Sequence, residues 1–250
     1  MDTIRADARQ QAHRALWDRK PVLREVYSHL YKRVAAHCRP GLTVEVGGGS
    51  GNFKHYRPDA LSFDIVPESW LDLVADAQFL PFGDATVANI VMLDVLHHIQ
   101  YPVRFLREAQ RVLSPRGRLI FVEPAITPVS CAVYRLFHEE PVWMNVDPLT
   151  DGEIDPGKDP YVGNQAIPTL LMTRFAEERA RAIPHLRPIR VDWLSLFAYP
   201  LSGGFKPWSL LSASFARRLL SIEDRLEHRL GRVMGFRLFA VLERTQGDPN

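Results

Sequence analysis

The chain has 250 residues, of which 46% are hydrophobic and 24% are charged, as in an ordinary globular protein. Its 31 basic and 29 acidic residues leave a formal net charge of +2, which gives no electrostatic argument for nucleic-acid binding. The two cysteines, Cys38 and Cys131, lack the spacing of a disulfide framework or a zinc site, so a reducing, cytoplasmic location is expected.

Residues 1–40 are expected to form two amphipathic helices. Residues 4–18 and 21–38 both space their apolar side chains three and four positions apart. Pro21 suits the first turn of the second helix, and Pro40 follows its end. We predict that these N-terminal helices form a lid over the rest of the fold.

Strands alternate with short helical segments from residue 41 to residue 124. The sequence predicts a helix over 102–113 and strands over 42–46, 61–65, 71–77, 87–93 and 117–124. The run 87–93 is almost continuously apolar, as in a strand buried on both faces. This alternation predicts a parallel sheet covered by helices.

The character of the chain changes after Pro124, and nine of the 19 prolines lie between positions 124 and 188. We expect residues 125–235 to form an insertion that covers the substrate. Its predicted elements are helices near 128–138 and 168–183, a sixth strand near 188–197, and a helix over 209–235 that breaks near Gly231. Residues 236–244 are expected to return to the core sheet as its last strand.

A glycine cluster follows the first predicted strand, in the segment TVEVGGGSGNF. Gly47, Gly49 and Gly51 form G-x-G-x-G, whereas the dinucleotide fingerprint G-x-G-x-x-G needs a glycine at position 52, which is Asn. Glu45, just before the cluster, would repel a pyrophosphate in a partly desolvated cleft. The loop therefore favours a phosphate-free cofactor with cationic groups over a nicotinamide cofactor, and an NAD-dependent oxidoreductase stays a remote alternative.

The segment EVGGGSG resembles the first motif of class I S-adenosylmethionine-dependent methyltransferases, in which an acid precedes G-x-G-x-G. The segments SFDIVP, ADAQFLPFGDATVANIVMLDVLHHI and VLSPRGRLIFVEP continue the likeness in the same order, and the second is similar to the methyltransferase type 11 branch. The resemblance covers residues 40–124. It implies a Rossmann-like α/β fold with a seven-stranded, mostly parallel sheet, an antiparallel last strand and a helical lid insertion.

The same resemblance implies that S-adenosylmethionine binds at the carboxyl ends of the strands in residues 41–124, and that S-adenosylhomocysteine is the product. Asp64 would accept hydrogen bonds from the ribose hydroxyls, Asp76 would contact the adenine amino group, and Ala77 would contact the ring through its backbone. The implied cofactor-binding residues are Glu45, Gly47, Gly49, Gly51, Asp64, Asp76, Ala77, Leu93 and Asp94.

Two polar clusters offer candidates for proton transfer. One is His97-His98 after the fourth predicted strand, and the other is FHEEP at 137–141. Histidine is the side chain that most readily exchanges a proton near neutral pH, which makes His98 and His138 the catalytic candidates. Packing of the histidine pair, and solvation of FHEEP as a helix end, are the interpretations that we favour. The nearby acids Glu139, Glu140, Asp147, Asp151 and Asp155 could serve a divalent metal, but loop acids are usually solvated and no metal is expected.

The predicted activity is O- or C-methylation of a small molecule or of a lipid- or sugar-linked metabolite, because the segment 196–208 is apolar and aromatic. A catalytically silent S-adenosylmethionine-binding partner protein is the alternative. The amphipathic helix 209–235 could lie on a membrane, but its acids Glu223, Asp224 and Glu227 argue against this. The sequence leaves the oligomeric state and the acceptor open.

Overall fold

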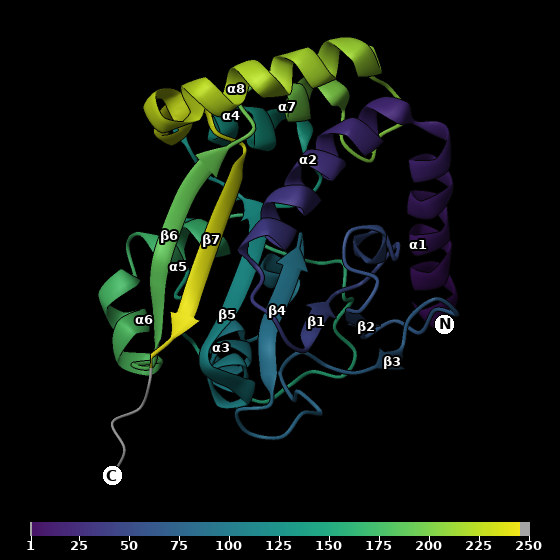
Figure 1. Cartoon of the computed structure of the whole chain (residues 1–250). Helices are drawn as coiled ribbons and strands as arrows, with labels where there is room; N and C mark the ends of the chain where they lie inside the picture. Colours follow the sequence, from purple (N-terminus) through teal and green to yellow (C-terminus); the bar gives the residue numbers. More distant parts are fainter. Residues whose placement is uncertain (1, 246–250) are drawn as a thin grey trace.

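The computed structural model describes residues 2–245, with the side chains of residues 8–245 (Figure 1). The strands are β1 (Thr43–Val46), β2 (Leu61–Asp64), β3 (Leu73–Val74), β4 (Val87–Leu93), β5 (Leu113–Pro124), β6 (Leu186–Leu194) and β7 (Arg237–Arg244). The α-helices are α1 (Asp2–Arg19), α2 (Pro21–His37), α3 (Pro102–Val112), α4 (Pro128–Phe137), α5 (Ile167–Met172), α6 (Ala176–Ala182), α7 (Ala198–Ser202) and α8 (Ala213–Met234). The 3-10 turns are η1 (Phe53–His55) and η2 (Leu96–His98).

The strands form one sheet in the order β3-β2-β1-β4-β5-β7-β6. β1 to β5 run parallel, and β7 runs antiparallel to both of its neighbours, β5 and β6. This confirms the predicted seven-stranded, mostly parallel sheet. Because β1, β2 and β4 are parallel neighbours, their carboxyl ends meet at one edge, where α/β folds bind ligands.

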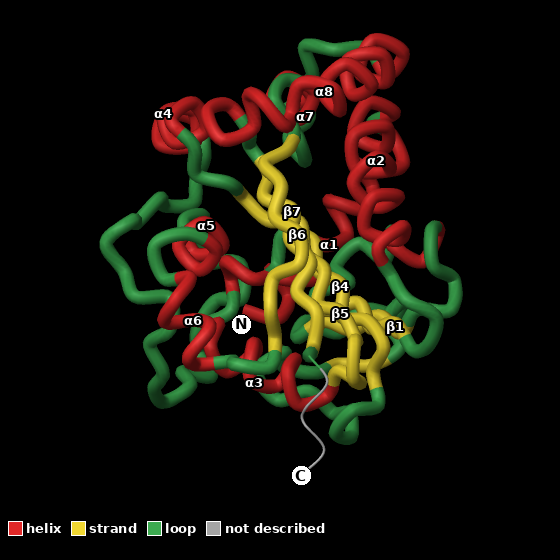
Figure 2. Tube along the Cα trace, turned by 60° about the vertical axis from the view of Figure 1, so that its left-hand side comes forward, coloured by secondary structure: helices red, strands yellow, loops and turns green. Residues whose placement is uncertain are grey.

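Helices cover both faces of the sheet, as the tube view shows (Figure 2). One apolar layer packs α3 and α5 against alternate side chains of β4, β5 and β7, including Met92, Phe121 and Ala240. The other layer packs α1, α2 and α8 against the intervening residues, such as Val91 and Phe239. A strand with apolar side chains on both faces is the pattern expected for a buried parallel sheet.

Several predicted boundaries are wrong. β5 begins at Leu113, not 117, because Leu113 already pairs with Val87 before a register shift. β3 has two paired residues, and they lie within the segment 71–77 that is predicted to contain a strand. The predicted helix 168–183 is two short helices separated at 173–175. Short elements of this kind owe their limits to tertiary pairing, which a local pattern does not contain.

α8 is continuous through Gly231, where the sequence predicts a break. Ser212 starts the helix by accepting a hydrogen bond from the backbone N–H of Phe215 at 3.3 Å. A Cβ on Gly231 would overlap the backbone carbonyl oxygen of Trp193. The glycine therefore permits close approach of the helix to the end of β6, and it does not interrupt the helix.

Lys20 joins the N-terminal helices to the region after α7. This residue separates α1 from α2 and is buried. Its Nζ donates hydrogen bonds to the backbone oxygens of Gly204 (2.7 Å), Lys206 (2.7 Å) and Trp208 (2.9 Å). Three carbonyl acceptors satisfy the three N–H donors of the ammonium group, so one side chain fixes the loop 203–208 against the helix junction.

Across residues 2–245, no helix combines the length and the apolar character that crossing a bilayer requires.

The close contact at Gly231 generates a stability prediction. We expect Gly231→Ala to lower the free energy of unfolding by about 1–3 kcal/mol, because the added methyl group must displace backbone of β6. The helix propensity gained from alanine, about 1 kcal/mol, opposes this effect. Ser221→Ala, at an exposed position of the same helix, is the control and should be neutral or slightly stabilising. Denaturant unfolding measures both; a Gly231→Ala variant as stable as the control would contradict the prediction.

Candidate functional site

Three glycines hold the loop after β1 in left-handed backbone conformations. The φ angles are +70° at Gly47, +38° at Gly49 and +72° at Gly51. A Cβ on Gly47 would overlap the side chain of Val95, and one on Gly51 would come within 2.7 Å of the Trp70 ring. The loop therefore presents bare backbone at the carboxyl end of β1, as a cofactor that approaches closely requires.

A glycine is also required at position 48, which was not predicted from the sequence. The run of three glycines is the pattern that could have indicated it. A Cβ at this position would overlap the hydroxyl oxygen of Ser62. The hydroxyl of Ser62 donates a hydrogen bond to Glu45 Oε2 at 2.6 Å. Gly48 therefore leaves room for the contact that holds the carboxyl group of Glu45 beneath the loop.

Glu45 is buried, and this changes its predicted role. Burial raises the pKa of Glu45 to about 8, although the Ser62 hydrogen bond and the charge of Lys54 act in the opposite direction. The carboxyl group is largely protonated at neutral pH in this environment. The charge repulsion that favoured a phosphate-free cofactor is accordingly weaker than the sequence suggested, and the identification of the cofactor depends on other features.

Asp64 fixes the other side of the glycine loop. Its Oδ2 accepts a hydrogen bond from the Gly49 N–H at 3.0 Å, and its Oδ1 accepts one from the Val66 N–H at 3.1 Å. The side chain of Gln10, from α1, also bonds to this carboxylate. Burial nevertheless raises the pKa of Asp64 above its ordinary value. The structure thus places Asp64 against the loop, under the N-terminal helix.

Asp94, directly after β4, is neutralised by a buried arginine. Its backbone has a φ of +60°. Arg237 forms an ion pair with both carboxylate oxygens, one at 3.0 Å, and the hydroxyl of Tyr27 donates to the same carboxylate at 3.0 Å. The guanidinium group also lies 3.9 Å from the centre of the Tyr199 ring. Asp94 therefore lies at the predicted strand end, and Arg237 is its counter-ion within the protein.

The remaining predicted cofactor residues lie along the same edge. The carboxylate of Asp76 accepts a hydrogen bond from the backbone N–H of Gln78 at 2.8 Å, which makes it a turn-forming residue after β3. Ala77 is buried in the apolar layer, and Leu93 is half-buried at the end of β4.

α1 crosses above the glycine loop. The indole N–H of Trp70 donates to the Gly49 carbonyl at 2.8 Å, and Arg14 of α1 stacks on the Trp70 ring at 4.2 Å. The His13 ring lies 4.6 Å from that of Phe205. Burial lowers the pKa of His13, whereas the negative charge of Asp94 favours the protonated form of the imidazole and so acts to raise it. Trp70, His13 and Arg237 were not predicted. For Arg237 a signal exists, since it is a charged residue that opens a strand whose next five residues are apolar.

His97 forms a second polar centre beyond Asp94. Its Nδ1 lies 2.6 Å from Glu123 Oε2, and its Nε2 lies 3.2 Å from Glu140 Oε2. The other oxygen of Glu123 accepts the backbone N–H groups of Val95 and Leu96, both at 2.8 Å. Burial by itself would lower the pKa of His97, but Glu123 and Glu140 outweigh it and raise the value to about 9. His97 is an imidazolium held between two carboxylates.

The structure brings His98 and His138 to this same centre, which unites the two polar clusters of the sequence. His98 Nε2 lies 4.0 Å from Glu140 Oε1, and the Glu140 N–H donates to His138 Nδ1 at 3.2 Å. Burial and the charge of His97 lower the pKa of His98 to about 3, and burial lowers that of His138. Against the effect of burial, the hydrogen bond from His97 lowers the pKa of Glu140 to about 2. Both candidate histidines are therefore neutral at pH 7.

The other acids of the insertion do not join this centre. Glu139 is exposed and pairs with Lys206 at 3.6 Å, while Asp151 pairs with Arg104 and Arg107. Asp155 accepts a hydrogen bond from the Gly157 N–H within its own turn. The oxygen-rich metal set considered from the sequence is not assembled.

His97, His98 and Glu140 could hold a metal ion, because one donor atom from each lies within 4.8 Å of the others. His97 is protonated between the two carboxylates that face it, so a cation would have to displace this proton before the imidazole could bind it. The expectation that the protein uses no metal stays a prediction.

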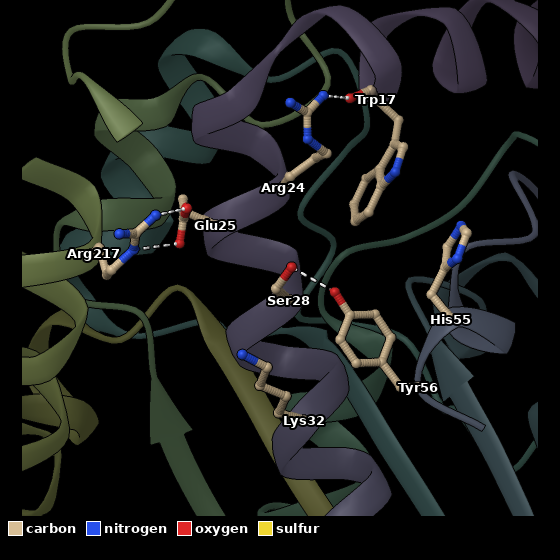
Figure 3. Close-up of a pocket in the computed structure, with 8 residues that line it drawn as sticks. All are labelled: Trp17, Arg24, Glu25, Ser28, Lys32, His55, Tyr56 and Arg217. Atoms are coloured by element: carbon tan, nitrogen blue, oxygen red, sulfur yellow. Dashed lines mark hydrogen bonds and ion pairs between the residues drawn. The ribbon is translucent and has the colours of Figure 1, made fainter. Parts of the chain in front are cut away.

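A surface groove of about 590 Å³ lies elsewhere, between α2 and η1 (Figure 3). Its lining contains none of the predicted cofactor residues. The charged groups there bond to the protein: Arg217 of α8 pairs with Glu25 of α2, and Arg24 donates to the Trp17 carbonyl at 2.7 Å. The groove thus forms part of the contact between α2 and α8.

Comparison with known proteins agrees with this arrangement. Residues 44–121, from β1 into β5, match the sequence profile of the family described as "Methyltransferase domain". This part of the chain is therefore similar to a methyltransferase type 11 domain. The cofactor of this S-adenosylmethionine-dependent methyltransferase family is S-adenosylmethionine.

In sequence, this chain is 38% identical over 64 residues to the demethylmenaquinone methyltransferase of Protochlamydia amoebophila (strain UWE25), and the match spans 26% of each chain. In structure, it is similar to an S-adenosylmethionine-dependent methyltransferase of Thermotoga maritima, with a TM-score of 0.55 and 13% identity over 94% of this chain and 99% of that one. It is also similar to a chain in the complex between the Haloferax volcanii Trm112 methyltransferase activator and a methyltransferase, with a TM-score of 0.54 and 17% identity over 100% of both chains. These likenesses confirm the fold of the methyltransferase.

The burial of Glu45 generates a pH-dependence prediction. Its folded-state pKa of about 8 lies above the ordinary value of 4.5, so the folded protein keeps a proton that the unfolded chain releases between these values. The free energy of unfolding should therefore fall with rising pH across this window, by up to about 1.4 kcal/mol per pH unit. Glu45→Gln removes the titration and leaves Ser62 an acceptor, so its stability should depend less on pH.

Denaturant unfolding at intervals from pH 5 to pH 8 measures this difference, with Glu139→Gln at an exposed position as the control. Parallel curves for Glu45→Gln and the unmodified methyltransferase would show that Glu45 is not protonated in the folded state. Calorimetric titration of the same variants with S-adenosylhomocysteine shows separately whether Glu45 contributes to cofactor binding.

Proposed function

We propose that this protein transfers a methyl group from S-adenosylmethionine to a small or lipid-linked acceptor. The observation that carries the proposal is the glycine loop, in which Gly47, Gly49 and Gly51 adopt left-handed conformations beside Asp64. A side chain at any of these glycines would be strained, and one at Gly47 or Gly51 would also meet Val95 or Trp70. The carboxylate of Asp64 is held where a hydroxyl-bearing ligand on the loop would meet it.

The residues present fit this cofactor. We propose that the backbone of the glycine loop and Asp64 hold its nucleoside part, with Asp76 and Ala77 toward the adenine, and that Glu45, Leu93 and Asp94 border its amino-acid part. When bound, S-adenosylmethionine supplies a methyl group on a cationic sulfur, which is already a good leaving group. The protein's task is then mainly to align donor and acceptor.

This placement of the cofactor suggests a role for each segment of the chain. We propose residues 1–40 as a lid, 41–124 as the cofactor-binding core, 125–235 as the acceptor-selecting insertion, and 236–244 as the strand that completes the core sheet. Lys20 and the stacking of His13 on Phe205 support the contact between lid and insertion.

On the acceptor side, we propose that His98 and His138 orient the acceptor through hydrogen bonds. A group with a pKa of about 3 holds protons weakly, so His98 is poorly suited to remove one from an alcohol. The imidazolium of His97 fixes Glu140 beside both rings. This electrostatic arrangement favours an acceptor that is acidic already, such as a phenol or an enolisable carbon, over an aliphatic alcohol.

Two features support an acceptor with a large apolar part. The surroundings of Asp94 are aromatic, because the Tyr27 ring of α2 contacts the rings of Tyr199 and Phe205 from the insertion. The relative from Protochlamydia amoebophila is named for demethylmenaquinone as its acceptor. A catalytically silent binding protein is the alternative, and it predicts cofactor binding without methyl transfer to any acceptor.

Calorimetric titration tests the cofactor. We expect S-adenosylhomocysteine to bind, and Asp64→Asn to weaken that binding about 10- to 100-fold, because a charged hydrogen-bond partner is worth about 1.5–3 kcal/mol. Asp59→Asn, at an exposed acid that pairs with Arg57, is the control and should bind as the unmodified protein does. Thermal unfolding verifies that both variants fold. Binding of NADH without binding of S-adenosylhomocysteine would end the proposal.

Kinetics test the acceptor side. Incubation with methyl-labelled S-adenosylmethionine and separate lipid and polar cell extracts identifies the labelled product and hence a substrate. With that substrate, we expect His98→Asn to reduce kcat/KM about tenfold without changing the pH profile, since an orienting hydrogen bond is worth about 1.4 kcal/mol. The exposed His185→Asn variant is the control. A loss of about 10²–10⁴ with an altered pH profile would instead identify His98 as a general base.

A further inference from the structure

The outward face of α8 carries a row of apolar residues beside a row of arginines. Phe215, Ile222 and Val233 are 54%, 51% and 51% exposed. At about 100° per residue, these three side chains and those of Arg218, Arg225 and Arg229 fall within an arc of about 80° on the helix. The exposed side of α8 is thus amphipathic in its own right, distinct from the side that packs on the protein.

The acids that seemed to argue against membrane binding do not face this way. Glu223 is buried, and its carboxylate accepts the backbone N–H groups of Leu196, Phe197 and Ala198 at 2.6–3.1 Å. These three bonds hold the start of α7. The carboxylate of Glu223 is therefore engaged by hydrogen bonds inside the fold and contributes no negative charge to the outer surface.

The other two acids of α8 pair with α2. Glu227 bonds to Arg33 at 2.9 Å, and Asp224 bonds to Arg33 at 2.7 Å and to His29 at 2.9 Å. Arg217, on the same side, pairs with Glu25 of α2 (Figure 3). The side of α8 turned toward α2 is thus internally neutralised.

The arginines of the outward face have no such partners. Among the described residues, none forms an ion pair or a hydrogen bond with the guanidinium groups of Arg218, Arg225 or Arg229. Arg232, at the edge of this face, stacks on the Trp193 ring at 4.4 Å. The exposed surface of α8 therefore combines unpaired positive charge with exposed apolar side chains.

The exposed apolar surface continues ahead of the helix. Trp208 and Leu210, which precede α8, are 48% and 73% exposed. Tryptophan beside an arginine-rich amphipathic helix is typical of a surface that lies in the headgroup region of a bilayer.

We propose that the outward face of α8, with Trp208 and Leu210, docks this protein onto anionic lipid bilayers. Charge complementarity requires an anionic partner, and the row of apolar residues beside the arginines requires one that also accepts apolar groups. Nucleic acid meets the first requirement only. A bilayer containing anionic lipids meets both along the whole length of the helix.

The position of α8 connects this surface to the proposed acceptor site. Glu223 links the helix to α7, and Tyr199 of α7 stacks on Arg237, the counter-ion of Asp94. A bilayer on the outer face would lie about one helix diameter, or 10 Å, from this wall. Docking would bring a membrane-resident acceptor to the insertion; this last step rests on the proposed methyl transfer, whereas docking itself does not.

Co-sedimentation with lipid vesicles tests the docking. We expect the full chain to bind vesicles of equal parts phosphatidylcholine and phosphatidylglycerol, to bind pure phosphatidylcholine far less, and to lose binding as salt is raised. Arg225→Glu/Arg229→Glu should lower the partition coefficient at least about 25-fold, from about fivefold per basic residue removed near an anionic surface. Phe215→Ser/Ile222→Ser should lower it without changing the net charge.

The control is Arg181→Glu/Arg187→Glu, which makes the same change of net charge at exposed positions on α6 and at the start of β6. Equal losses in the control and in the α8 variant would show that only net charge matters, and would overturn the proposal. Absence of vesicle binding, or binding to duplex DNA in preference to vesicles, would overturn it as well. Titration of every variant with S-adenosylhomocysteine should give unchanged affinity, which separates failure of docking from failure of the proposed function.

Discussion

The buried ion pair between Asp94 and Arg237 is the interaction on which the arrangement of the site depends. Asp94 directly follows β4, which leads to the histidine cluster, and Arg237 is the first residue of β7. The hydroxyl of Tyr27 on α2 and the ring of Tyr199 on α7 complete the environment of this pair. A buried charge is tolerated only when it is compensated, so this one contact draws four distant segments to a single point.

This pair also explains why the sheet ends as it does. Because β7 runs antiparallel to β5 and β6, its first residue, Arg237, lies opposite Pro124 at the carboxyl edge of the parallel strands. An arginine at the opposite end of β7 would emerge on the far side of the sheet. The direction of β7 and the charge compensation of Asp94 are therefore linked.

The sequence predicted those parts of the protein that depend on local pattern. The alternation of strands and helices follows from periodicity, and the glycine loop follows from three closely spaced glycines. The seven-stranded sheet and the assignment of Asp64 and Asp94 to the site follow from the resemblance to a known family. The charge state of Glu45 did not follow, because it depends on burial and on Ser62, which comes from the neighbouring strand. The union of His98 with His138 depends likewise on how the insertion folds back over β4.

The acids of α8 are a second case in which a local sequence pattern does not predict the surroundings of a charged group. Glu223, Asp224 and Glu227 lie close together in sequence, and by composition alone they offset the arginines around them. In the fold they turn toward α2 and α7, which leaves the outward surface positive. Net charge along a helix is a property of the sequence, but the charge that a partner meets is a property of the packing.

Lys20 couples the position of the N-terminal helices to that of the loop 203–208. Its ammonium group holds three carbonyls of the loop 203–208, and it stands at the hinge between the helix above the glycine loop and the helix beside Asp94. α1 cannot swing away without either breaking these bonds or moving the loop with it. The contact of α1 with the glycine loop is therefore coupled through Lys20 to the position of the loop 203–208 in the insertion.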